Sequence, residues 1–135
     1  MKRLLLLTIG LFVGCSPVEI DYGGSGDFIV HNKSNKLIRV EITKVSQLGG
    51  DLDTSELIES DSSRIVLSDA IIGSNVTPQR SISSMKIFED SIGSMILLYT
   101  QDPIDESKWL IQKQYSGDFG YTRNVFNFND SMITR

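Results

Sequence analysis

The sequence predicts an all-β fold, an antiparallel sandwich of two sheets with seven or eight strands. After an apparent leader of 14 residues, the remaining 121 residues suffice for one domain of ordinary size. These residues include 28 Ile, Val and Thr against 9 Leu and Ala, and β-branched side chains favour strands over helices. Short segments of alternating polar and apolar residues recur between polar turns, which is typical of two packed sheets.

The first fifteen residues have the layout of a signal peptide. Lys2 and Arg3 precede an apolar stretch from Leu4 to Val13, and Gly14-Cys15 follows. As a helix this stretch spans about 15 Å, half of the roughly 30 Å hydrocarbon core of a bilayer. We therefore expect residues 1–14 to be cleaved rather than to remain as a membrane span.

Cys15 is the sole cysteine of the chain, so it cannot form an internal disulfide. Leu11-Phe12-Val13-Gly14-Cys15 resembles the bacterial lipobox, with Phe12 at the place where the family usually has Leu. The resemblance implies a covalent lipid on Cys15, a diacyl thioether, with a third chain on its amine. Two or more chains hold a protein on a membrane. The alternative is a buried free cysteine near the end of an ordinary signal peptide.

Residues 15–26 are expected to form the lipidated cysteine and a flexible tether. Pro17 and three glycines within four residues, Gly23, Gly24 and Gly26, have the composition of a spacer. The sandwich domain should then cover residues 27–135. Because Ser16 rather than an aspartate follows Cys15, analogy with bacterial sorting favours the outer membrane; the periplasmic and the surface-exposed face both stay open.

Alternation predicts the strands one by one. In chain order they cover residues 27–32, 37–45, 57–58, 64–67, 85–89, 95–100, 108–115 and 121–128. Polar residues 60–63 predict a short hairpin between the third and fourth of these strands. Gly93 suits a positive-φ turn position between the fifth and sixth. Residues 73–84 are polar and predict either a long loop or a poorly formed strand.

Charge and residue inventory argue against several functions. Without the leader, 11 basic and 17 acidic residues remain, and this acidic balance disfavours a nucleic-acid binder. His31, the only histidine, is expected on a surface or rim. Residues 51–56 begin like a calcium loop, but Glu56 and Ser62 stand where a glycine and a closing acid are needed, so only a weak cation site stays open. We expect no enzyme activity, no catalytic residues, no metal and no cofactor beyond the lipid.

Aromatic residues suggest a binding surface. They gather in the C-terminal third of the chain, as Tyr99, Trp109, Tyr115, Phe119 and Tyr121. Trp109 alternates in phase with Ile111, which favours the core. Tyr115, Phe119 and Tyr121 border glycines in a predicted loop and are the candidate ligand-binding residues, since exposed rings stack on sugars or seat a protein.

The lipobox, the Gly-rich tether and the segments 28–34 and 121–130 together resemble small lipoproteins of Bacteroidetes-type bacteria with immunoglobulin-like sandwiches. Asp90-Ser91-Ile92 and Asp130-Ser131-Met132 also match the O-glycosylation pattern of such bacteria. The resemblance implies no particular activity. Our leading hypothesis is a non-enzymatic, membrane-anchored envelope lipoprotein that presents its sandwich to a protein partner or has a structural role. The alternative is a glycan-binding accessory lipoprotein that uses the C-terminal aromatics.

Overall fold

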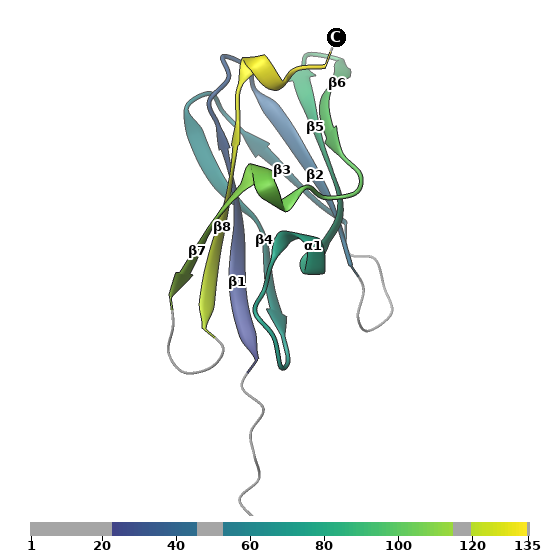
Figure 1. The fold of residues 1–135 in the computed structure, drawn as a ribbon. Coiled ribbons are helices and arrows are strands. Elements are labelled where there is room, and N and C mark those ends of the chain that lie inside the picture. The colour runs from purple at the N-terminus through teal and green to yellow at the C-terminus, as the bar shows by residue number, and fades with distance from the viewer. Residues whose placement is uncertain (1–22, 46–52, 115–119, 135) are drawn as a thin grey trace, which may run out of the picture.

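The chain folds into two facing β-sheets, and the short helix α1 (Pro78–Ser81), between the fourth and fifth strands of the chain, lies beside them (Figure 1). The computed structural model describes residues 23–45, 53–114 and 120–134; the predicted leader, Cys15 and most of the predicted tether lie outside them. The elements are β1 (Gly24–Asn32), β2 (Ile38–Lys44), β3 (Asp53–Ile58), β4 (Ser62–Ile71), α1 (Pro78–Ser81), β5 (Ile82–Ser91), β6 (Ser94–Gln101), η1 (Glu106–Lys108), β7 (Trp109–Gln114), β8 (Tyr121–Phe128) and η2 (Asp130–Met132).

Each sheet contains four strands, which confirms the predicted sandwich. Sheet 1 has the order β4-β1-β8-β7 and sheet 2 the order β3-β2-β5-β6. Every pair is antiparallel except β1 with β8, which run parallel from Ser25–Tyr121 to Asn32–Phe128. Immunoglobulin domains share the two-layer architecture but divide their strands between the sheets in another order.

Alternating side chains from both sheets form one core. Phe28 and Val30 of β1 and Phe126 and Phe128 of β8 are fully buried. They face a matching set from sheet 2: Ile38, Val40, Ile42, Met85 and Ile87. Burial stabilises the fold by roughly 1.5–3 kcal/mol for each such side chain. The strands at 27–32, 37–45 and 121–128 therefore have the inward faces that their alternation predicts.

The domain begins earlier than the sequence predicts, because Gly24 and Gly26 belong to β1 rather than to a tether. Both glycines are buried on the inner face of sheet 1, where the loop that follows β4 passes close to β1. Gly24 donates its backbone N–H to the Ser74 carbonyl at 3.1 Å. A Cβ at Gly24 would lie 2.5 Å from that same oxygen, and a Cβ at Gly26 would lie 2.8 Å from the Thr122 carbonyl oxygen. These glycines permit a close backbone approach, which composition alone does not distinguish from flexibility.

One predicted hairpin is wrong and another is confirmed. β3 pairs with β2 and β4 pairs with β1, so the chain crosses from sheet 2 to sheet 1 at residues 59–61 instead of forming a hairpin. Alternation gives the inward face of a strand but not its neighbour, and this explains the error. β5 and β6 do form a hairpin, with Ser91 opposite Ser94 and Gly93 at a φ of +84° in the turn.

The ambiguous segment 73–84 combines a loop, a helix and the start of a strand. After the loop, Pro78 opens α1, where its fixed φ suits the first turn, and β5 begins at Ile82. Val76 and Ile82 anchor the segment in the core. Within the described parts of the chain, no helix is long and apolar enough to span a membrane.

Candidate protein-interaction surface

The three candidate aromatics do not come together in the described structure. Tyr115 and Phe119 lie outside the described residues. Tyr121 is half-buried on β8, and its hydroxyl donates a hydrogen bond to Asp27 Oδ2 at 2.6 Å. This bond raises the pKa of the Tyr121 phenol above its ordinary value of 10.0, because it favours the protonated form. The phenol is therefore engaged with β1 at this end of sheet 1.

Tyr99 and Trp109 belong to the core, as the alternation of Trp109 with Ile111 predicts for the tryptophan. Trp109 Nε1 donates to Gln101 Oε1 at 3.2 Å, and Gln101 Nε2 donates to the Tyr99 hydroxyl at 3.0 Å. The Trp109 ring also packs against Phe126, with centroids 5.3 Å apart. Since all polar atoms of this chain of contacts are satisfied inside the domain, neither ring is available to a ligand.

Residues with catalytic or metal-binding chemistry are dispersed. His31 lies half-buried on β1, with Ser63 and Asn127 as its neighbours across the sheet. Asp105 caps η1, accepting hydrogen bonds from the Ser107 hydroxyl and amide, and these bonds lower the pKa of the Asp105 carboxyl. Within residues 23–45, 53–114 and 120–134, no three His, Cys, Asp or Glu side chains are grouped so that they could hold a metal ion.

The outer face of sheet 2 carries an apolar surface that the sequence analysis missed. We call it the Phe88 patch, and its residues are Leu37, Leu57, Phe88, Met95 and Leu97. Its residues lie in two rows that run across sheet 2. In the first row, Leu57 of β3, Arg39 of β2, Phe88 of β5 and Leu97 of β6 lie opposite one another. In the second row, Met95 of β6 lies opposite Asp90 of β5, whose backbone amide bonds to Leu37. The leucines and the methionine are 40–49% exposed. Clustered apolar side chains of this kind mark binding surfaces more often than isolated ones do.

An ion pair lies within the Phe88 patch. The Arg39 guanidinium donates from Nε and Nη2 to Asp90 Oδ2, at 3.0 and 2.6 Å. Nη1 also donates to the Ser55 hydroxyl at 3.4 Å. The two charged side chains are 31% and 24% exposed, so they are partly covered by the apolar residues around them. The patch therefore combines apolar contact area with a neutralised charge pair.

Strand β6 extends the patch to an open edge of sheet 2. Met95, Ile96 and Leu97 are each about half exposed, at 49–52%, and Ile92 at the hairpin tip is fully exposed. Four consecutive apolar residues, Met95 to Leu98, interrupt the alternation in this strand. This apolar run is the feature of the sequence that could have predicted the patch. A strand with alternating residues has apolar side chains on its buried face only, whereas a continuous apolar run also places them on the exposed face.

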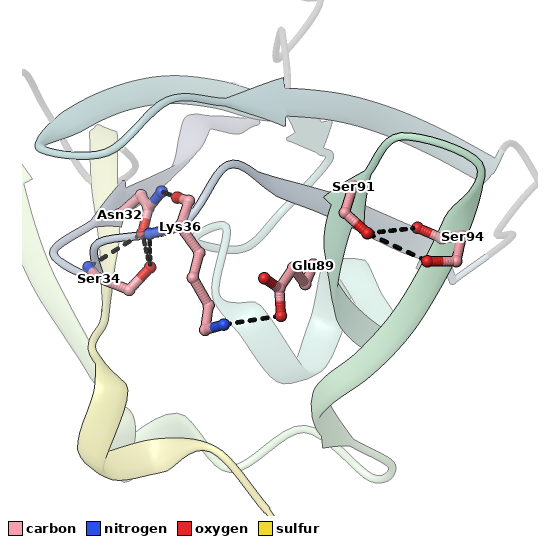
Figure 2. Close-up of polar contacts among 6 residues, drawn as sticks. All are labelled: Asn32, Ser34, Lys36, Glu89, Ser91 and Ser94. Atoms are coloured by element: carbon pink, nitrogen blue, oxygen red, sulfur yellow. Dashed lines mark hydrogen bonds and ion pairs between the residues drawn. The ribbon is translucent and has the colours of Figure 1, made fainter.

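Polar contacts hold this end of the sandwich in place, as Figure 2 shows. The Asn32 side chain accepts from the Ser34 amide at 3.0 Å and donates to the Lys36 carbonyl at 2.7 Å. Lys36 Nζ reaches across to Glu89 Oε2 at 2.7 Å, and the Ser91 and Ser94 hydroxyls meet at 3.0 Å. The β1–β2 turn and the β5–β6 hairpin are thus linked, so the patch lies on a fixed part of the domain.

A separate polar hollow lies beside α1, with a volume of about 480 Å³. Its lining includes Ser74, Gln79, Arg80, Glu106 and Lys113. Glu106 Oε1 accepts from the Gln79 backbone amide at 3.1 Å, which ties α1 to η1. Tyr121 does not line this hollow. Its neighbour Thr122 faces the inside of the sandwich, where its hydroxyl donates to the Val76 carbonyl, and successive side chains of a strand point to opposite faces.

The sequence-predicted modification sites are accessible. Ser91 lies exposed in the β5–β6 hairpin, and Ser131 lies exposed in η2, where its hydroxyl donates to Asn129. Comparisons with known proteins add no assignment, since no protein-family model, no curated protein and no solved structure matches the chain. The function is therefore inferred from the chemistry of the surfaces of the domain.

Proposed function

We propose that the chain is a non-enzymatic, membrane-anchored lipoprotein of the bacterial envelope that presents the Phe88 patch to a protein partner. The observation that carries the proposal is the patch itself, whose apolar side chains gather on one face of sheet 2 and along its β6 edge. Half-exposed Leu and Met side chains around an internally neutralised ion pair suit a protein partner, because binding them removes apolar area from water and desolvates no unpaired charge.

The anchor is proposed from the sequence, at Cys15. Eight residues separate Cys15 from Gly24, where β1 begins, and an extended chain of this length reaches roughly 30 Å. β1 runs the length of sheet 1, and the turn at its far end leads into β2 (Figure 1). The Phe88 patch lies at that far end, since Leu37 directly precedes β2 and Met95 lies near the start of β6. An anchor joined at Gly24 therefore leaves the patch accessible.

Intact mass measurement tests the anchor directly. Protein extracted from the membrane fraction should begin at Cys15 and carry the mass of a diacylglyceryl group, with or without an amide-linked chain. The Cys15→Ser variant should keep its leader and lack the lipid. An unmodified Cys15, or a leader still attached to the parent protein, would refute the envelope proposal.

A second test addresses the patch. Leu97→Arg places a charge on an exposed position of the Phe88 patch and should abolish co-isolation of a specific partner from detergent-solubilised membranes. Leu110→Arg is the matched control, since Leu110 is 54% exposed on the edge strand of the other sheet. Equal recovery of the same partner with both variants would exclude the Phe88 patch as the binding surface.

Glycan binding is the alternative, and the polar hollow beside α1 is the feature that favours it. Arg80, Gln79 and Glu106 supply donors and acceptors that can pair with sugar hydroxyls. Arg80→Ala should then abolish retention on an immobilised polysaccharide, and so should alanine at Tyr115, Phe119 or Tyr121 if the predicted aromatics contribute. Absence of binding to a broad panel of glycans by the parent protein would exclude this function.

A further inference from the structure

We propose that a second copy of this chain binds at the β6 edge of the Phe88 patch, joined β6 to β6 in antiparallel orientation so that two copies of sheet 2 form one continuous sheet and their two patches one continuous surface. The inference rests on the proposed function and deepens it, since it names the partner that binds where the patch reaches the β6 edge. It rests on the edge chemistry, the free backbone groups and the charge arrangement of β6.

Edge strands of a soluble sheet normally carry charged residues that oppose pairing with another chain. Three of the four edge strands in the two described sheets follow this rule. β3 contains Asp53 and Glu56, β4 contains Arg64 and Asp69, and β7 contains Lys113. β6, with the sequence SMILLYTQ, contains no charged residue and no proline. Among these edges, β6 is therefore the one without protection against strand addition.

At defined positions of β6, the outward backbone groups have no hydrogen-bond partner among the described residues. Two residues connect Ser91 to Ser94, so these two form the hydrogen-bonded pair that closes the hairpin. Bonded and non-bonded pairs alternate along antiparallel strands, which directs the backbone groups of Ile96 toward β5 and those of Met95 and Leu97 away from it. The Leu98 carbonyl, by contrast, accepts from the Thr134 amide at 2.9 Å. The C-terminal segment thus limits the free edge to residues 94–97.

These limits select one register. Placing Met95 opposite Leu97 of the second copy lets both residues use their outward backbone groups, and the two-fold symmetry repeats the pair. Ile96 then lies opposite Ile96 of the second copy, on the symmetry axis. This register keeps the pleat continuous, so the outward side chains of Met95 and Leu97 remain on one face.

The charges near the axis are compatible with two-fold pairing. Glu89 and Asp90 are the acidic residues opposite Ile96 and Met95, and each already has a cation in its own copy. Lys36 contacts Glu89 at 2.7 Å and Arg39 contacts Asp90 at 2.6 Å. Residues 94–97 are uncharged, so pairing brings apolar side chains of Met95, Ile96 and Leu97 together without an unpaired charge.

Membrane anchoring favours this association. An edge of four residues makes a small interface, and confinement to one membrane raises the effective concentration of the two copies. The two-fold axis lies perpendicular to β6, so the two β1 starts are at opposite ends of the pair. Both tethers reach the same membrane when the strands lie along its surface, since each tether extends up to roughly 30 Å.

A cysteine cross-link tests the register in the full chain in its membrane. Antiparallel residues of a non-bonded pair have Cα atoms about 4.5 Å apart, within the range that a disulfide spans. Ile96→Cys should therefore give a disulfide-linked dimer after mild oxidation, and peptide mass analysis should place the bond at position 96 of both copies. The parent chain controls for Cys15, and Leu110→Cys controls for random collision of exposed edge positions.

A second substitution tests whether the β6 pairing produces the cross-link. Leu97→Lys, added to Ile96→Cys, should reduce the dimer yield at least ten-fold while the circular dichroism spectrum stays unchanged. Equal yields from Ile96→Cys and Leu110→Cys, no effect of Leu97→Lys, or cross-linking of position 96 to a different envelope protein would each overturn the second copy as the partner of β6. The lipid mass on Cys15 is measured in the same samples. A lipidated protein without the dimer refutes only this inference, and a dimer without the lipid refutes only the anchor.

Discussion

Arg39 and Asp90 join neighbouring strands β2 and β5 through two hydrogen bonds to one carboxylate oxygen, at 3.0 and 2.6 Å. Asp90 also donates its backbone amide to the Leu37 carbonyl at 3.0 Å, so both its side chain and its main chain attach to β2. The pair holds Arg39 between Leu57 and Phe88, where a free guanidinium would interrupt the apolar surface.

This geometry predicts a modest coupling between the two residues. Because both side chains are about a quarter to a third exposed, a double-mutant cycle of Arg39→Met and Asp90→Asn should give a coupling of about 0.5–1 kcal/mol in urea unfolding. The coupling should fall in 1 M NaCl, since salt screens exposed pairs. A coupling near zero at low salt would show that the ion pair contributes nothing to the stability of the patch.

Gly24→Ala should destabilise the domain. The added Cβ would meet the Ser74 carbonyl oxygen at 2.5 Å, and backbone must move to relieve this contact. Overpacking of this kind costs about 1–3 kcal/mol, measurable as a lower urea midpoint. Ser25→Ala is the control, because Ser25 is exposed on the same strand. If Gly24 and Gly26 were part of a flexible tether, Gly24→Ala would leave the midpoint unchanged.

Asn32→Ala should cost about 2–3 kcal/mol of unfolding free energy. The fully buried Asn32 amide donates to the Ile58 and Glu59 carbonyls at 3.1 Å, and these acceptors would lose a partner where the chain crosses between the sheets. Thermal and urea unfolding should both report the loss. The exposed neighbour Asn35 provides the control, since Asn35→Ala should change stability by less than about 0.5 kcal/mol. Equal effects of the two variants would contradict this role.

The Tyr121 phenol should titrate above the ordinary tyrosine pKa of 10.0. Its folded-state pKa exceeds 10.0 because the phenol donates to Asp27, so the stabilisation is fully present below pH 10 and is lost as pH rises through the folded-state pKa. NMR titration of ring-labelled tyrosine, assigned with Tyr121→Phe, measures this. Asp27→Asn should return the Tyr121 pKa toward 10.0; no change in that variant would show that another group causes the shift.

The sequence was sufficient for the architecture because alternation and β-branched composition report directly on half-buried strands. Phe126 and Phe128 lie inward, and Gly93 has a positive φ, as predicted. Which strands pair with one another was harder to predict from the sequence. β3 and β4 are consecutive but lie in different sheets, and β1 pairs with β8 from the far end of the chain. Such long-range pairings depend on the whole core rather than on local residues.

The binding surface was harder to predict than the core. Searching for aromatic residues selected Tyr115 and Phe119, which lie outside the described residues, and Tyr121, whose hydroxyl is occupied by Asp27. The Phe88 patch combines residues of β3, β5 and β6 with Leu37 just before β2, and only the strand register brings Leu57 and Leu97 into one row. Sequence spacing carries no information about that row, apart from the apolar run beginning at Met95.

The parallel pairing of β1 with β8 makes the order of synthesis matter. The partner of Ser25 is Tyr121, so the first strand waits for almost the entire polypeptide to emerge before sheet 1 can close. Until β8 is present, the hydrophobic core that buries Phe28 and Val30 is incomplete. A truncated chain that ends before β8 therefore leaves the apolar inward face of β1 uncovered, which makes such a product a ready substrate for proteases.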